Sequence, residues 1–147
     1  MSLKAKKPKL WSVDELERIY KTTPNKKLGE RLLYVLKWAD RKGSLIEDRR
    51  YYPQFGLRGK SGIRIMSFWS PEKHHTNPPG SVHIFINPQL YASTKERDML
   101  LEKLNKLLHF SDDLDKLNLG KTSEKSLADL SEDDFSTFLR IVEEYSY

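Results

Sequence analysis

The sequence predicts an α+β domain in which helices pack on one face of a small antiparallel sheet of three strands or slightly more. Segments with helical spacing of apolar residues stand near both ends of the chain, whereas the middle alternates apolar with polar residues between Gly and Pro. The connections between the alternating segments are too short for helical crossovers, so neighbouring strands should run antiparallel. The predicted order is α-α-β-β-β-α-α.

Two helices are predicted before the strands. Ser12 and Glu15 form a capping-box pattern at the start of the first helix, which we expect over about residues 13–22. The second helix lies within residues 25–43, and Gly43 is expected to take the left-handed position that ends it. Its core-facing stripe is predicted to comprise Leu28, Leu32, Val35, Leu36 and Ala39.

Three strands are predicted in the middle of the chain, within residues 54–58, 62–69 and 80–87. In the second strand, strict alternation predicts that Arg64 shares a face with Met66 and Phe68, whereas Ile63, Ile65 and Ser67 face the other way. In the third strand, one face is predicted to hold Val82, Ile84 and Ile86, and the other His83, Phe85 and Asn87.

Two further helices are predicted after the strands. The first starts at Ser93 or Thr94 and ends near His109, where the helix dipole favours an imidazolium. Its buried face is expected to comprise Met99, Leu100, Leu104, Leu107 and Leu108. A polar stretch follows over about residues 111–125, and Ser131 is the predicted N-cap of the last helix.

The 147 residues suit one domain, which we divide into a basic tail over residues 1–10 and a single α+β domain over residues 11–147. The chain has no cysteine, which excludes disulfides, thiolate metal ligands and cysteine nucleophiles. No apolar run is long enough to cross a bilayer, and the basic start is followed by no apolar signal segment. We therefore expect a cytoplasmic protein without a membrane partner.

Charge is distributed unevenly along the chain. Residues 1–75 hold 18 Lys and Arg against 8 Asp and Glu, whereas residues 111–147 hold 4 against 10. Such asymmetry is typical of a protein with an anionic partner, but it is also produced by two ends that fold onto each other or by solvated surface charge.

The residues that could support catalysis lack the spacing that catalysis needs. A third hypothesis for the function is a metal-dependent hydrolase that uses His74, His75 and His83. Adjacent histidines in a Pro-rich loop diverge, however, so a loop between strands is the preferred interpretation. The Gly59-Lys60-Ser61 triplet lacks the first glycine of a phosphate-binding P-loop. We expect no enzyme activity, no catalytic residue, no bound metal and no cofactor.

A basic, aromatic-rich region over residues 49–69 is the strongest functional signal. Cations neutralise phosphates and aromatic rings stack on bases, so a mixture of the two is typical of nucleic-acid surfaces. The predicted phosphate contacts are Arg49, Arg50, Arg58, Lys60 and Arg64. The predicted stacking residues are Tyr51, Tyr52 and Trp69, and the tail over residues 4–9 adds attraction. The competing interpretation is that the aromatics are core residues and the cations a solvated rim.

The leading functional hypothesis is therefore a non-enzymatic accessory domain that binds DNA or RNA. The alternative is a protein–protein interaction domain that forms a homo-oligomer or binds another protein through its acidic last helix or a sheet edge.

The chain also resembles an uncharacterised bacterial α+β C-terminal domain found beside nuclease-like or DNA-modification modules. The similarity covers about Leu28 to Tyr145 and rests on the segments RLLYVLKWADRKG, SVHIFINPQLYAS, LLEKLNKL and FSTFLRIVEEY. Members of that family carry a Trp-Thr-x-Gly turn between the last two strands, where this chain has SPEKHHTNPPG. The resemblance implies an accessory or recognition module without assigned catalytic residues.

Overall fold

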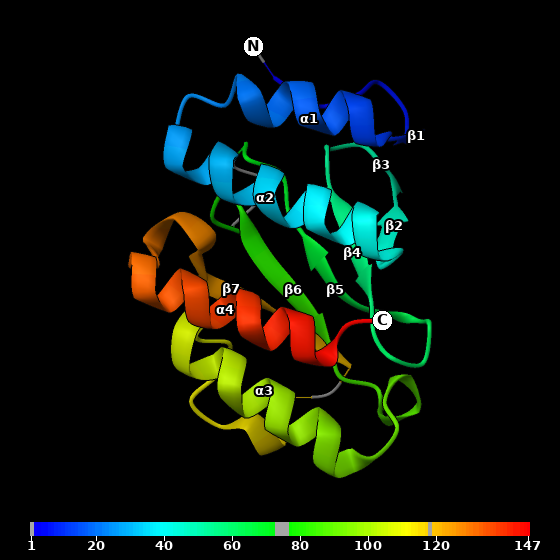
Figure 1. The fold of residues 1–147 in the computed structure, drawn as a ribbon, viewed down its shortest axis with the longest axis vertical. Helices are drawn as coiled ribbons and strands as arrows, with labels where there is room; N and C mark the ends of the chain where they lie inside the picture. Colours follow the sequence, from blue (N-terminus) through cyan, green and yellow to red (C-terminus); the bar gives the residue numbers. More distant parts are fainter. Residues whose placement is uncertain (1, 73–76, 118) are drawn as a thin grey trace.

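The computed structural model describes residues 2–72, 77–117 and 119–147 (Figure 1). The described helices are α1 (Val13–Lys21), α2 (Lys26–Lys42), α3 (Thr94–Leu108) and α4 (Glu132–Tyr145), with short 3₁₀ turns η1 (Pro88–Leu90), η2 (Leu114–Lys116) and η3 (Leu127–Asp129). The strands are β1 (Lys9–Leu10), β2 (Leu45–Glu47), β3 (Arg49–Arg50), β4 (Phe55–Arg58), β5 (Arg64–Phe68), β6 (Ser81–Phe85) and β7 (Gly120–Ser126).

The strands form two antiparallel sheets. Five of them pair in the order β2-β4-β5-β6-β7, and β1 pairs with β3 in a separate two-stranded sheet. The helices lie in front of the five-stranded sheet in Figure 1. The predicted α+β class and antiparallel pairing are confirmed, and β4, β5 and β6 lie within the three predicted strand segments.

The predicted three-stranded sheet and its element order are wrong in detail. The five-stranded sheet gains β2 at one edge and β7 at the other, and β7 falls between α3 and α4 in the chain. The sequence of β7, GKTSEKS, contains no apolar residue. Its buried positions are Ser123 and Ser126, so this edge strand lacks the alternating apolar signal by which strands are recognised.

The core lies between the sheet and the helices. Phe55 and Leu57 of β4, Met66 and Phe68 of β5, and Val82 and Ile84 of β6 are all fully buried. Phe68 stacks on Phe55 at 4.8 Å between ring centroids and meets Phe138 of α4 edge-on at 6.2 Å. Tyr20 of α1 packs against Phe55 at 6.3 Å. These contacts place α1 and α4 on the same side of the sheet.

The helix ends follow the predicted chemistry. The Ser12 hydroxyl accepts from the Glu15 amide at 3.2 Å and the Glu15 carboxylate accepts from the Ser12 amide, which completes the capping box. Gly43 has φ +74° and ends α2 in the left-handed conformation. In α3, Leu100, Leu104 and Leu108 are buried as predicted, whereas Met99 is exposed, Leu107 is half-buried and Leu101 is buried in addition.

A β-bulge overturns the predicted orientation of Arg64. The pairing of β4 with β5 shifts register between Leu57 and Arg58, because Leu57 pairs with Met66 but Arg58 pairs with Arg64. The extra residue in β5 turns Arg64 onto the side of Ser67, whose hydroxyl accepts a hydrogen bond from the guanidinium at 3.0 Å. Strict alternation therefore fails at this position, whereas it is confirmed in β6, where Val82 and Ile84 are buried and His83 and Phe85 are half-buried.

None of the helices in the described ranges combines the length and the apolar character that a bilayer crossing requires.

Candidate nucleic-acid interface

Two basic segments that are 40 residues apart in the sequence pair directly in the structure. Lys9 of β1 lies opposite Arg50 of β3, and Leu10 lies opposite Arg49. The Ala5 amide extends the contact by donating to the Tyr51 carbonyl at 2.8 Å. The N-terminal tail is thus held against the strand that carries two arginines. We call this assembly the basic ribbon and define it by Lys4, Lys6, Lys7, Lys9, Arg49 and Arg50.

The ribbon holds little compensating negative charge. Lys9 makes an ion pair with Glu15 and also lies over the Trp11 ring, 4.6 Å from its centroid. Across the described ranges, the other five ribbon cations have no carboxylate within ion-pairing distance. The side chains of Lys6, Lys7, Arg49 and Arg50 are exposed. Asp48 directly precedes Arg49, and its carboxylate is paired with Arg64. Solvated cations held close together with few ion pairs are suited to an anionic polymer.

The two predicted stacking tyrosines follow the ribbon directly in the chain. Tyr51 is 46% exposed, and the Lys4 ammonium lies 5.6 Å from the centroid of its ring. Tyr52 is half-buried. Of the eight predicted site residues, Arg49, Arg50, Tyr51 and Tyr52 are therefore brought together with the basic tail.

Arg58 and Lys60 lie elsewhere. β4 starts beside the ribbon at Phe55 and ends at Arg58, so the turn that follows it stands at the opposite end of the sheet (Figure 1). The Arg58 guanidinium donates to the Gly62 carbonyl across this turn at 3.2 Å, and Lys60 is exposed. These two cations form a separate group and do not extend the ribbon.

Arg64 lies between the two groups and makes an ion pair with Asp48. Its two terminal nitrogens donate to the two carboxylate oxygens of Asp48 at 2.7 and 2.6 Å, and Gln54 donates to the same carboxylate at 3.2 Å. Burial alone would raise the pKa of Asp48, but hydrogen bonds and charge from Arg64 outweigh it and hold the pKa below its usual range. Arg64 is therefore neutralised and fixed by a bidentate contact.

Trp69 lies on the face of the sheet that the helices leave uncovered. We call this side the open face. Gly56, Ser67, His83 and Thr122 follow one another across it as cross-strand neighbours. The Trp69 ring meets the His83 ring edge-on at 6.3 Å between centroids, and His83 meets Phe85 at 4.6 Å. Trp69, His83 and Phe85 are all half-buried. Three rings thus form a continuous group beside the Arg64 ion pair.

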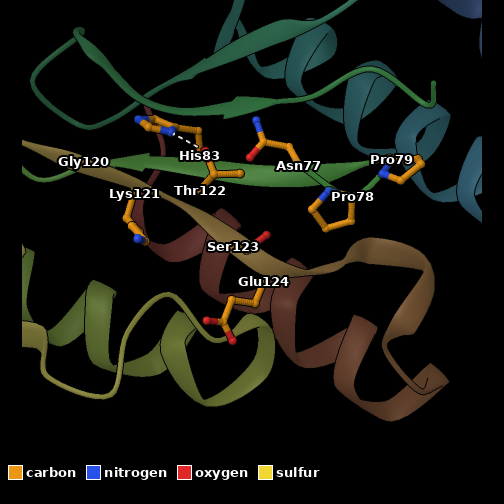
Figure 2. Close-up of a pocket in the computed structure, with 9 residues that line it drawn as sticks. All are labelled: Asn77, Pro78, Pro79, His83, Gly120, Lys121, Thr122, Ser123 and Glu124. Carbon is orange, nitrogen blue, oxygen red and sulfur yellow. Dashed lines mark hydrogen bonds between the residues drawn. The ribbon is translucent and has the colours of Figure 1, made fainter. Parts of the chain in front are cut away.

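A groove of about 770 Å³ opens beside His83 (Figure 2). Its walls are the turn at Asn77, Pro78 and Pro79 and the strand from Gly120 to Glu124. Nδ1 of His83 is hydrogen-bonded to the Thr122 hydroxyl at 2.8 Å. Burial lowers the pKa of His83, so the imidazole is neutral at pH 7.

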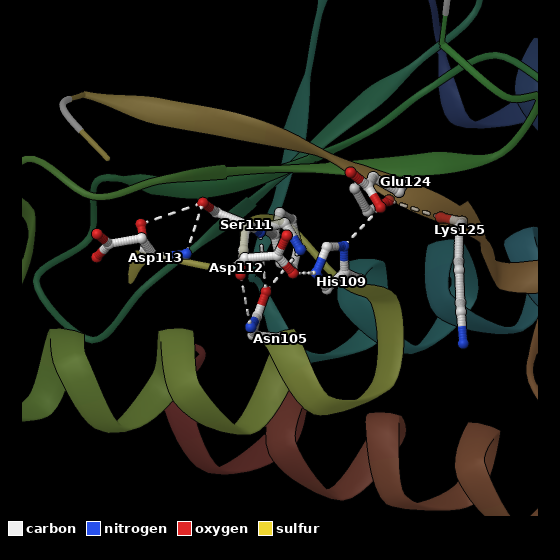
Figure 3. Close-up of polar contacts among 9 residues, drawn as sticks. Asn105, His109, Ser111, Asp112, Asp113, Glu124 and Lys125 are labelled. Atoms are coloured by element: carbon white, nitrogen blue, oxygen red, sulfur yellow. Dashed lines mark hydrogen bonds and ion pairs between the residues drawn. The ribbon is translucent and has the colours of Figure 1, made fainter. Parts of the chain in front are cut away.

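Glu124, which also lines the groove, belongs to a polar cluster between the end of α3 and β7 (Figure 3). His109 ends α3 with φ +56°, and its imidazole bridges two carboxylates: Nε2 contacts Asp112 at 2.9 Å and Nδ1 contacts Glu124 at 2.5 Å. These hydrogen bonds, that of Asp112 first, raise the pKa of His109. Asn105 supports the turn by accepting from the amides of Phe110 and Ser111 at 2.6 and 3.1 Å.

The proposed histidine metal site lies partly outside the described residues, since His74 and His75 fall in the segment 73–76. Within the described ranges, no three His, Asp or Glu side chains are placed to share a metal ion. The metal-dependent hydrolase hypothesis stays a prediction.

Several residues of the open face were missed by sequence reasoning. His83 was assigned to the hypothetical metal site but not to a group with Trp69, and Phe85 was assigned to no site. Gly120 and Thr122 fell in a stretch described only as polar. The only signal available was the alternation of β6, which indicates that His83 and Phe85 share a face without showing that Trp69 joins them.

No family model, curated protein or solved structure matches the chain. The resemblance to a bacterial accessory domain therefore stays a prediction, and functional inference rests on the geometry of the chain itself.

Proposed function

We propose that the protein is a nucleic-acid-binding domain that contacts the phosphate backbone through the basic ribbon. The pairing of the lysine-rich tail with the Arg49–Arg50 strand carries this proposal. It brings the six ribbon cations onto neighbouring stretches of chain, and among the described residues only Lys9 makes an ion pair. Binding a polyanion releases its condensed counterions, which supplies a favourable free energy that isolated surface charges do not gain.

The ribbon suits backbone contacts better than base readout. Its cations lie on a two-stranded sheet and on the tail that precedes it, and Lys6 and Lys7 form a bend outside both strands. Contacts from such side chains to phosphate oxygens position the nucleic acid but contain no sequence information. We therefore expect binding that depends strongly on salt and weakly on sequence.

A pair of matched lysine variants tests the proposal. Lys6→Ala with Lys7→Ala removes two ribbon charges, and Lys26→Ala with Lys27→Ala removes two exposed lysine charges at the start of α2. Both variants lose the same net charge and the same side-chain type. In fluorescence anisotropy with a labelled oligonucleotide at low salt, we expect the ribbon variant to bind roughly 10-fold more weakly than wild type.

The control variant should bind within about 2-fold of wild type, since its lysines lie outside the ribbon. An equal loss in both variants would show that net charge alone governs affinity. Absence of binding in the wild-type protein would refute the proposed function.

A further inference from the structure

The open face adjoins the ribbon but differs from it in chemistry. Apart from the mutually neutralised Arg64 and Asp48, the described residues of its central row are uncharged, and its largest side chains are the rings of Trp69, His83 and Phe85. The ribbon presents mainly cations, whereas the open face presents rings and a groove. The two surfaces therefore suit different parts of one ligand.

Hydrogen bonds join the open face to the ribbon. The Leu3 amide donates to the Glu72 carboxylate at 2.7 Å, which places the start of the tail beside the segment that follows Trp69. On the other side, Asp48 immediately precedes Arg49 of the ribbon while its carboxylate holds Arg64 on the open face. The start of the tail and Asp48 thus lie next to residues at the border of the open face.

A glycine lies against His83 at the border of the groove. Gly120 lies in β7 beside His83, and a Cβ atom at this position would stand 2.8 Å from Nε2 of the imidazole and 2.7 Å from the Ile84 carbonyl oxygen. A glycine inside a strand often marks the close approach of a ligand or another backbone. Here the missing side chain makes room for the imidazole itself, whose Nε2 edge lies against Gly120 at the border of the groove (Figure 2).

We propose that the open face is a stacking platform for the unpaired bases of a single-stranded nucleic acid. The proposal rests on the proposed function and adds the class of ligand to it. Phosphates lie along the basic ribbon, and successive bases pack against Trp69, His83 and Phe85. The imidazole of His83 packs against Gly120 and is held at Nδ1 by Thr122, so its ring is fixed in position for a base to pack on.

Single strands fit this arrangement and duplexes do not. Bases in a duplex are stacked on one another and present only their edges, so they cannot cover side-chain rings unless they are flipped out. Bases of a single strand are free to stack on aromatic side chains, and every base has a face to offer. The platform therefore selects strandedness and not sequence.

An abasic oligonucleotide separates the two surfaces. We would compare oligothymidylate of about eight nucleotides with an abasic deoxyribose-phosphate strand of equal length and with a duplex of the same length, each by anisotropy at low salt. If only the ribbon contacts the nucleic acid, all three ligands should bind through their phosphates with similar affinity. If bases also stack on the open face, oligothymidylate should bind roughly 10-fold more tightly than the abasic strand.

Ring-removing variants locate the effect. Trp69→Leu and Phe85→Leu keep an apolar side chain but remove a ring, and each should bring oligothymidylate close to the affinity of the abasic strand. Tyr34→Leu is the matched control, because Tyr34 is an exposed aromatic residue on α2, away from the open face. Thermal unfolding shows which variants fold.

The comparison of the three ligands with the wild-type protein tests the proposal even if a variant fails to fold. Equal binding of oligothymidylate and the abasic strand would overturn the platform and leave the ribbon intact. A preference for bases that survives in Trp69→Leu and Phe85→Leu would place stacking elsewhere and also overturn it. No binding of any strand would refute both the platform and the proposed function.

Discussion

Among single residues, Arg64 shows how a cation predicted to bind phosphate can acquire a structural role. Its bidentate contact with Asp48 joins β5 to the connection between β2 and β3, and it covers Gly56, where a Cβ atom would stand 2.9 Å from the guanidinium carbon. The side chain of Asp48 is buried, whereas that of Arg64 is 21% exposed. Removing one partner of such a pair leaves the other charged group without compensation.

We predict that Arg64→Ala lowers the free energy of unfolding by roughly 2–4 kcal/mol near neutral pH. This destabilisation is somewhat smaller than that caused by breaking a fully buried ion pair, because Arg64 is partly exposed. Arg64 depresses the pKa of Asp48, so its stabilisation is present above the unfolded pKa near 3.8 and is lost as pH falls through the folded pKa. The difference between wild type and variant should therefore shrink as pH is lowered from about 7 towards about 3.

Urea denaturation at several pH values measures this difference. Arg41→Ala serves as the control, because Arg41 is exposed and makes no ion pair with any described residue; its effect should stay within about 0.5 kcal/mol. If Arg64→Ala lowered the free energy of unfolding by the same amount at every pH, the ion pair would not be the cause of the destabilisation.

Among the elements, those with a strong periodic signal were predictable and those held by side-chain hydrogen bonds were not. The helices and the strands β4, β5 and β6 follow from apolar spacing and caps such as Ser12. β7 was missed because its inward positions are serines: Ser123 replaces a ladder hydrogen bond by accepting from the Val82 amide at 2.9 Å. β1 and β3 were missed because two-residue strands have no period to detect.

The candidate site was partly predictable for the same reason. Composition identified Arg49, Arg50 and the lysine-rich tail, but not that they pair. The grouping of Trp69 with His83 depends on the register of β5 against β6, which no local pattern encodes.

The connection from α3 to β7 depends on protonation of His109. Its pKa is raised by hydrogen bonds with Asp112 and then Glu124, so its stabilisation is fully present below the unfolded pKa near 6.5 and is lost as pH rises through the folded pKa. By NMR, we predict that His109 titrates above 6.5 and that His83, whose pKa burial lowers, titrates below it.

A Glu124→Gln variant should move the His109 midpoint down and leave His83 unchanged, because Glu124 contacts only the former. His109→Asn tolerates the positive φ and removes the titrating group, so stability should depend less on pH between about 6 and 8. Identical titration of the two histidines would contradict this account.

At the scale of the whole molecule, the fold brings together basic residues that are far apart in the first half of the sequence. The basic first half does not spread evenly, because the tail and β3 pair with each other while Glu15 occupies only one of their cations. Glu132, Asp133 and Asp134 lie in the first turn of α4, where the dipole favours them, whereas Glu143 and Glu144 lie near its other end. Glu132 pairs with Arg31 of α2 and Glu144 with Lys103 of α3, so cations of earlier helices balance part of the acidic charge of α4.

The most direct test of the ribbon is the salt dependence of binding. We would measure the association constant of a single-stranded oligonucleotide between about 50 and 200 mM salt for wild type and for the two double-lysine variants. Each phosphate contact adds about 0.7 to the slope of log K against log salt. The Lys6→Ala, Lys7→Ala protein should therefore lose about 1.4 from the slope, and the Lys26→Ala, Lys27→Ala protein should keep it. Equal slopes for all three proteins, or no binding by any, would contradict a phosphate-binding ribbon and favour the homo-oligomeric interaction domain instead.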